Sequence, residues 1–212
     1  MQIFPRSLNL LPLVLGGAAT MGGAGLIGAI WYYFSPSHLQ VGYAPEQPVP
    51  YSHRLHAGEL GMDCRYCHSA VEDGAKANIP PTQTCMGCHS VVWPESARLA
   101  PVRESWETGE SIPWVKAHVL PDHAYFNHSV HLTAGVGCVS CHGRIDQMEV
   151  VRVEEPIAMQ WCLECHRDPG PNLRPPSEIT NMEWEPDAEW LASMDEHVAA
   201  VNPPEHCSGC HR

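Results

Sequence analysis

The sequence predicts a largely irregular chain of short α-helices, preceded by one helix long enough to cross a membrane. Three observations predict this fold. Residues Leu8–Phe34 form a stretch of 27 residues without a charged side chain, which is sufficient to span a bilayer. The 20 prolines and 17 glycines among 212 residues interrupt regular elements. All ten cysteines fall in five Cys-x-x-Cys-His motifs.

The N-terminal segment, residues 1–34, is predicted to be a retained transmembrane anchor. Arg6 precedes the uncharged stretch, and the next charged residue after it is Glu46. The positive-inside rule then places the N-terminus in the cytoplasm and the remaining chain in the periplasm of a bacterial inner membrane. The alternative is a cleaved signal peptide, whose apolar region is normally shorter. Residues 35–50 follow as a proline-containing linker.

Each Cys-x-x-Cys-His motif has the spacing that attaches a c-type haem. The two thiols bond to the porphyrin, and the histidine becomes the proximal ligand of the iron. Zinc sites are the alternative, but they use such motifs in pairs and need no histidine directly after the second cysteine. Five is an odd number, and no cysteine is left over. We therefore expect five covalently attached haems c.

The residues of these motifs divide into two sets. The thioether cysteines are Cys64, Cys67, Cys85, Cys88, Cys138, Cys141, Cys162, Cys165, Cys207 and Cys210. The proximal histidines are His68, His89, His142, His166 and His211.

The predicted fold is that of a multihaem cytochrome c, mostly irregular, with short α-helices packed around five haems. So many porphyrins in a chain of 212 residues must supply much of the apolar interior themselves. The formal net charge of −12 makes nucleic acid an unsuitable partner. The pattern of residues 94–109 predicts one or two short helices that end at Gly109. The pattern of residues 186–201 predicts a longer helix that begins at Pro186 and Asp187.

The haem region, residues 51–212, contains an internal repeat. The block Tyr51-Ser52-His53-x-x-His56 precedes two motifs, and the block Phe126-Asn127-His128-x-x-His131 precedes the next two, with offsets of 74 to 77 residues between matching positions. This repetition predicts duplicated dihaem units at residues 51–93 and 118–168, with a fifth haem at residues 185–212. Because identical histidine spacing precedes haem motifs in both blocks, His53, His56, His128 and His131 are the best candidates for distal iron ligands.

An aromatic-x-His-x-x-His block before Cys-x-x-Cys-His resembles the class III multihaem cytochromes c. More narrowly, the transmembrane segment together with HAGELGMDCRYCHS, VLPDHAYFNHSVH, CHGRIDQMEV and MQWCLECHR resembles the pentahaem subunit of alternative complex III, a quinol-oxidising bacterial complex. The resemblance implies that the first histidine of each block ligates the haem of the motif that follows. His53 would then pair with His68 and His128 with His142, while the second histidine serves a neighbouring haem.

Six side chains compete for the fifth distal position. His118 and His123 flank Leu120-Pro121-Asp122, and His197 lies on the apolar face of the predicted C-terminal helix, where packing is an alternative role. His206 directly precedes its own motif and could serve only another haem. Met148 and Met159 lie between the third and fourth motifs, and a thioether ligand would raise the reduction potential. The remaining candidates are thus His118, His123, Met148, Met159, His197 and His206.

The sequence favours electron transfer over catalysis. Nine histidines remain for five distal positions, so no iron need keep the open position that catalysis requires, and we expect no catalytic residues. The resemblance implies a relay within a respiratory or photosynthetic quinol:electron-acceptor oxidoreductase, with integral membrane quinol-oxidising and iron–sulfur subunits and a soluble cytochrome c or similar acceptor. The alternatives are a stand-alone membrane-anchored multihaem quinol dehydrogenase and a multihaem small-molecule reductase.

Overall fold

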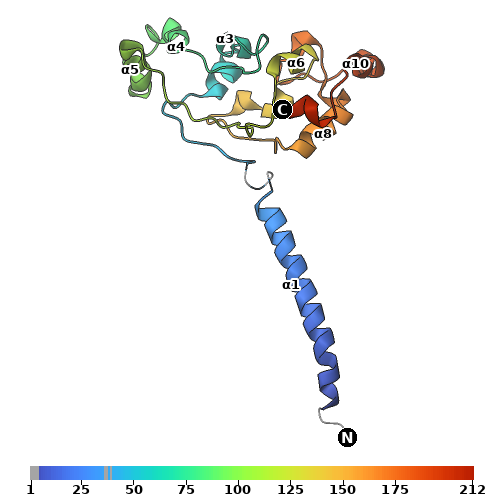
Figure 1. Ribbon diagram of the computed structural model, residues 1–212. Helices are drawn as coiled ribbons and strands as arrows, with labels where there is room; N and C mark the ends of the chain where they lie inside the picture. The colour runs from blue at the N-terminus through green and yellow to red at the C-terminus, as the bar shows by residue number, and fades with distance from the viewer. Residues whose placement is uncertain (1–4, 36–37, 39) are drawn as a thin grey trace. The chain divides into compact units, whose positions relative to one another are not determined.

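The computed structural model describes residues 5–35, 38 and 40–212, which form two compact units, Met1–Val41 and Gly42–Arg212. The first unit contains a 3-10 turn, η1 (Arg6–Leu10), and the helix α1 (Leu11–Tyr33) (Figure 1). Pro12 lies in the first turn of α1, where its missing amide hydrogen costs nothing. Together, η1 and α1 are long and apolar enough to cross a membrane.

The second unit consists of short helices joined by irregular segments, and its longest helices have nine residues. No strand occurs in the described part of the chain, which has only two isolated β-bridges. The elements are a π-helix η2 (Arg54–Glu59), α3 (Cys64–Cys67), α4 (Thr82–His89), η3 (Ala97–Leu99), α5 (Ala100–Thr108), α6 (His128–Thr133), α7 (Val139–His142), η4 (Ile145–Gln147), α8 (Met159–Arg167), η5 (Gly170–Asn172), η6 (Pro176–Glu178), α9 (Ala188–Ala192), α10 (Met194–Ala200) and α11 (Cys207–Cys210). The predicted fold class is confirmed in its helical, strand-free character.

Asx caps start the helices that carry two of the predicted sites. The Asp63 side chain accepts a hydrogen bond from the Arg65 amide at the start of α3, and Asn127 accepts one from Ser129 at the start of α6. These caps satisfy amides that a helix N-terminus leaves unpaired. The two caps therefore determine where Cys64 and His128 enter helical backbone.

The side-chain core is small. Among the described residues, nine apolar side chains are buried, and only Val102 is almost fully enclosed, at 1% exposure. They gather mainly in one cluster of Val49, Val102 and Ile112 and another of Val71, Leu132 and Ile179. A chain of this size normally buries far more apolar surface, which agrees with a fold that uses bound porphyrins as its interior.

The two helical regions predicted at residues 94–109 and 186–201 agree with the structure to different degrees. The first is confirmed as η3 and α5, and Gly109 ends α5 with a φ of 75°, a conformation that glycine adopts without strain. The second is broken at Ser193 into α9 and α10, because the Ser193 hydroxyl lies 3.1 Å from the carbonyls of Glu189 and Trp190. Such a side-chain bond competes with the helical backbone pattern.

The segment Gly42–Pro50, part of the predicted linker, packs within the second unit. The Gly42 amide donates to the Val153 carbonyl, and the Val153 amide donates to the Tyr43 carbonyl. Val49 is buried at 5% exposure. Burial of Val49 explains why this segment is ordered together with the helices that follow.

Candidate haem sites

Five histidine pairs are formed, and each joins the histidine of a Cys-x-x-Cys-His motif to one from another segment. We number the sites one to five in the chain order of their motifs. The ring centroids are 6.5 Å apart in His53–His68, 6.2 Å in His56–His89, 6.5 Å in His128–His142, 6.1 Å in His131–His166 and 5.6 Å in His123–His211.

These separations match two imidazoles that bind one metal ion from opposite sides. With metal–nitrogen bonds of about 2 Å and about 1 Å from nitrogen to ring centre, two such rings lie about 6 Å apart. Direct ring stacking would bring them closer, as in the 3.9 Å contact between Trp190 and His197. In the pair His53–His68 the ring planes are within 1° of parallel. The geometry therefore leaves room for an ion between the rings.

Backbone carbonyls orient most of the proximal rings. A ring whose Nδ1 donates to a carbonyl presents Nε2 for coordination, which fixes its tautomer. Four proximal histidines are held in this way: His68 by Asn78 at 2.6 Å, His89 by Val92 at 2.9 Å, His166 by Pro204 at 2.7 Å and His211 by His123 at 2.9 Å.

Three distal rings have the same arrangement. Nδ1 of His56 lies 2.8 Å from the Ser52 carbonyl, and Nδ1 of His131 lies 2.7 Å from the Asn127 carbonyl, four residues earlier in both cases. His128 contacts the Ala75 carbonyl at 2.9 Å. The Nε2 atoms are thus left for the metal-facing side.

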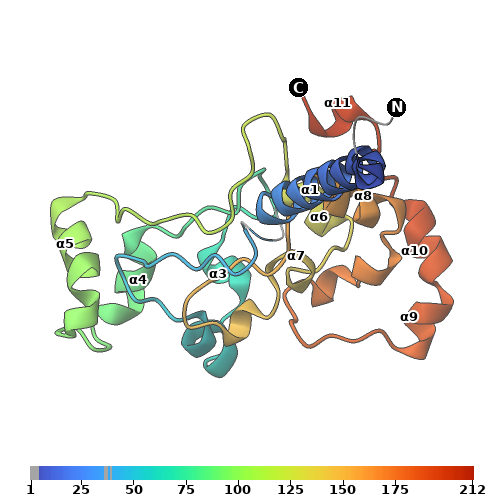
Figure 2. The same cartoon turned by 90° about the horizontal axis from the view of Figure 1, so that it is seen from below.

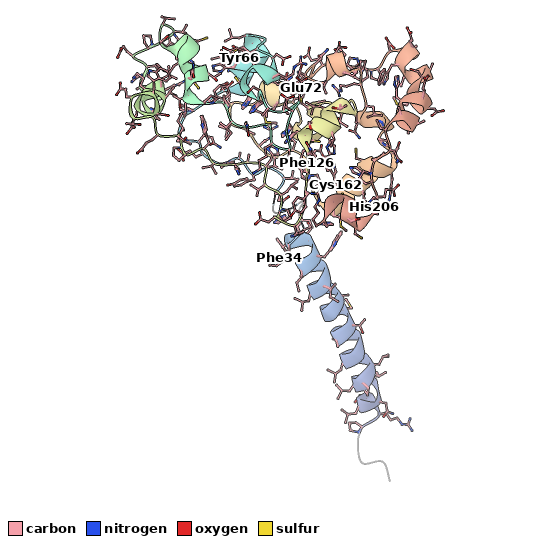
Figure 3. The ribbon with its side chains drawn as sticks, turned by 45° about the horizontal axis from the view of Figure 1, so that its top comes forward. Phe34, Tyr66, Glu72, Phe126, Cys162 and His206 are labelled. Carbon is pink, nitrogen blue, oxygen red and sulfur yellow. The ribbon has the colours of Figure 1, made fainter. Side chains whose placement is uncertain are left out.

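The two repeated blocks share their local geometry. The Tyr51 ring stacks on His56 at 4.4 Å and meets His53 edge-on at 4.8 Å. The Phe126 ring, labelled in Figure 3, contacts His131 and His128 at the same two distances, 4.4 and 4.8 Å. In each block one aromatic ring therefore holds two histidines that face different motifs.

Burial keeps several of these imidazoles neutral. Burial, reinforced by neighbouring histidines, lowers the pKa of His142 to about 3 and that of His53 to about 4. Burial also lowers the pKa of His131. A neutral imidazole is the form that binds a metal ion, so these rings are ready to coordinate at neutral pH.

Site three differs from the others in its hydrogen bonding. Nδ1 of His142 is buried without a hydrogen-bond partner, as is Nε2 of His118. The His118 ring meets His142 edge-on at 4.5 Å, with the planes at 76°. Because the two rings are too close for an ion to lie between them, His118 packs beside the site-three pair.

The other candidates for the fifth distal position have different surroundings from His123. His197 stacks on Trp190 and contacts Ser193 Oγ through Nε2 at 3.2 Å, which is a packing role. Met159 is 65% exposed and Met148 is buried at 3%. His206, labelled in Figure 3, directly precedes α11 without a side-chain hydrogen bond to the helix, and it is exposed.

The donor set fits haem better than zinc. In the described residues, no group of three or more His, Cys, Asp or Glu side chains could hold a metal ion, whereas a structural zinc site needs four ligands. Two opposed imidazoles suit an iron whose other four ligands come from a porphyrin. The adjacent cysteines would hold that porphyrin through thioether bonds. Nδ1 of His53 is buried without a hydrogen-bond partner in the described chain, so this polar atom is not satisfied by the protein residues alone.

Sequence reasoning missed the carbonyls that orient the proximal rings. Asn78, whose carbonyl accepts from His68, has a φ of 62°, and Trp93, which follows the acceptor Val92, has a φ of 53°. Non-glycine residues rarely adopt this conformation, and such strain tends to gather at functional positions. The only available sequence signal was asparagine at position 78, since asparagine tolerates this conformation.

Comparisons with known proteins relate the chain to multihaem cytochromes c. Residues 124–212 match the family model of cytochrome c7 and related cytochromes c. The chain is 30% identical over 213 residues to the menaquinone reductase multihaem cytochrome c subunit of Nitratidesulfovibrio vulgaris strain Hildenborough, covering 93% of this chain and 91% of that protein. It is 28% identical over 111 residues to the acrylate reductase cytochrome subunit of Shewanella woodyi, covering 52% of this chain and 68% of that protein. The chain therefore belongs to the family of multihaem cytochrome c subunits that includes the menaquinone reductase subunit.

Proposed function

We propose that this chain is a membrane-anchored pentahaem cytochrome c that relays electrons inside a quinone-linked oxidoreductase complex. The five histidine pairs carry the proposal, because every Cys-x-x-Cys-His histidine has a second imidazole 5.6 to 6.5 Å away. Its similarity to reductase cytochrome subunits supports an electron-carrying subunit rather than a catalytic one.

The proposed ligand set assigns one role to each side chain. The ten motif cysteines hold the porphyrins, and the motif histidines are the proximal ligands. When bound, haem irons accept and donate single electrons. The proposed distal ligands, in order of sites one to five, are His53, His56, His128, His131 and His123.

Two axial imidazoles at every site would exclude substrate from the iron. Catalysis on a small molecule needs an open coordination position, which this ligand set does not provide. The chain's residues therefore fix the spacing and orientation of the irons and control their access to water. This argues against the multihaem reductase alternative.

The proposed setting is a complex of the alternative complex III type. The two relatives are named as subunits of menaquinone and acrylate reductases, which supports assembly with other subunits. The resemblance to alternative complex III adds an integral membrane quinol-oxidising subunit, an iron–sulfur subunit and a soluble cytochrome c or similar acceptor. In this proposal α1 remains as the anchor, with its N-terminus in the cytoplasm and the haem region in the periplasm.

Purification in mild detergent tests the assignment. The expected preparation contains further membrane and iron–sulfur chains, shows five low-spin irons by electron paramagnetic resonance (EPR), and is reduced by a quinol. An isolated subunit would support the stand-alone quinol dehydrogenase instead. A high-spin iron that binds and reduces nitrite or hydroxylamine would overturn the relay and establish the reductase. A mature N-terminus beyond Phe34 would show that α1 belongs to a signal peptide.

A further inference from the structure

The spatial order of the five sites differs from their order in the chain. We infer that the sites form one unbranched row in the order two, one, three, four, five, so that sites two and five are its ends. This inference rests on the proposed function and deepens it, because it identifies where electrons enter and leave. Four links between neighbouring sites carry it.

The first link joins site two to site one. His53 and His56 lie three residues apart at the start of η2, yet they face His68 and His89 respectively. The Tyr51 ring contacts both distal histidines.

The second link joins site one to site three and therefore joins the two repeated blocks. Asp63, which caps α3, accepts a hydrogen bond from Thr180 Oγ1 at 2.9 Å, and the neighbouring Ile179 carbonyl accepts one from the Cys138 amide at 3.0 Å. Residues 179–180 thus bridge the two motifs.

A close backbone approach reinforces this second link. η2 packs on η4, the turn that follows the site-three motif. A side chain at Gly58 would collide with the Asp146 carbonyl, so glycine is needed there. The Arg54 amide also donates to the Met148 carbonyl at 3.0 Å. The block that supplies ligands to sites one and two is therefore anchored against site three.

The third link joins site three to site four in the way that the first joins sites two and one. His128 and His131 lie on one short helix, α6, and face His142 and His166.

The fourth link joins site four to site five. Pro204, just before the fifth motif, accepts the hydrogen bond from His166 Nδ1, and Arg167 pairs with Glu205 at 3.3 Å. The Tyr125 amide also donates to the Cys210 carbonyl, which ties site five to the segment that carries the ligands of sites three and four.

The helices show the same order. In Figure 2, α4 of site two, α3 of site one and α7 of site three follow one another across the second unit. On its other side, α4 packs on α5 and the Val102 cluster, which carry no motif. Site one is therefore internal although it comes first in the chain. Electrons are exchanged with partner proteins at sites two and five.

Two alanine variants in one segment test the order. Replacing His53 or His56 should open one iron and make it high-spin, because the thioether bonds keep the porphyrin. A high-spin iron accelerates the spin relaxation of adjacent low-spin irons, which EPR power saturation measures on the full-length ferric protein. In the inferred row, His53→Ala changes two low-spin signals and His56→Ala changes one. A row in chain order predicts the reverse and would overturn the inference.

Two controls separate the possible failures. Added imidazole should refill the opened position and restore the wild-type relaxation in both variants. If neither variant gains a high-spin iron, the ligand assignment and with it the proposed function fails, whatever the order. If a variant does not fold, proton NMR of the reduced wild type tests the order of the sites instead. The inferred row requires contacts between the porphyrins of sites one and three. Contacts between the porphyrins of sites two and three would overturn it.

Discussion

The choice between His123 and His118 as the distal ligand of site five gives the sharpest test of the site geometry. His123 faces the proximal His211 at 5.6 Å with ring planes at 29°, whereas His118 meets His142 edge-on at 4.5 Å. We expect His123→Ala to leave one iron of five without its distal ligand. About one fifth of the haem signal should then become high-spin, with all porphyrins retained.

The two substitutions should also differ in their effect on folding. His123 is exposed in the chain, and its carbonyl, which orients His211, remains in the alanine variant. Because the truncation removes the proposed bond between His123 and the iron, His123→Ala should nevertheless lower the melting temperature of the haem-loaded protein. His118 is partly buried against His142, so His118→Ala should cost about 1 kcal/mol of packing while all five irons stay low-spin.

The assays are EPR of the ferric protein, intact mass for the haem count and thermal unfolding, with His206→Ala as an exposed control. Imidazole should restore the low-spin signal of His123→Ala, because it can occupy the opened position. A high-spin iron in His118→Ala, together with five low-spin irons in His123→Ala, would refute the reasoning from ring separation.

Three further predictions follow from the motifs, the core and the charges. Intact mass of the native chain should show five haems, and Cys141→Ala should lower the haem count and the melting temperature; a native count below five would contradict the motif assignment. Val102→Ala should lower the free energy of unfolding by about 2 kcal/mol, since it removes buried methyl groups, while Val91→Ala, at a side chain that is 77% exposed, should have almost no effect. Hydrogen bonding to Arg65 lowers the pKa of Asp63 to about 2. This stabilisation is present above the unfolded pKa of about 3.9 and disappears as the pH falls through 2. Because the side chain is 42% exposed, Asp63→Asn should cost at most about 1 kcal/mol at pH 7, and the difference from wild type should vanish near pH 2. Equal melting temperatures of the two proteins at pH 7 would contradict this role.

The sequence by itself determined the chemistry of the sites. Five Cys-x-x-Cys-His motifs specify covalent attachment, because two thiols and an imidazole must occupy adjacent positions whatever the surrounding fold. The repeated His-x-x-His blocks predicted four distal histidines, since a three-residue spacing on a helical segment presents two rings from one short element. The apolar stretch before Phe34 predicted a long helix, which η1 and α1 form.

Only the tertiary structure brought the partners together. His123 and His211 are 88 residues apart, and no local pattern relates them. His118 satisfied the same sequence criteria as His123, but its ring meets His142 edge-on at 4.5 Å, whereas the His123 ring faces His211 at 5.6 Å. The row order depends on contacts such as Thr180 with Asp63, which are 117 residues apart. Periodicity and spacing describe neighbours along the chain, whereas the distance between two rings and the sequence of sites in space depend on how distant segments pack.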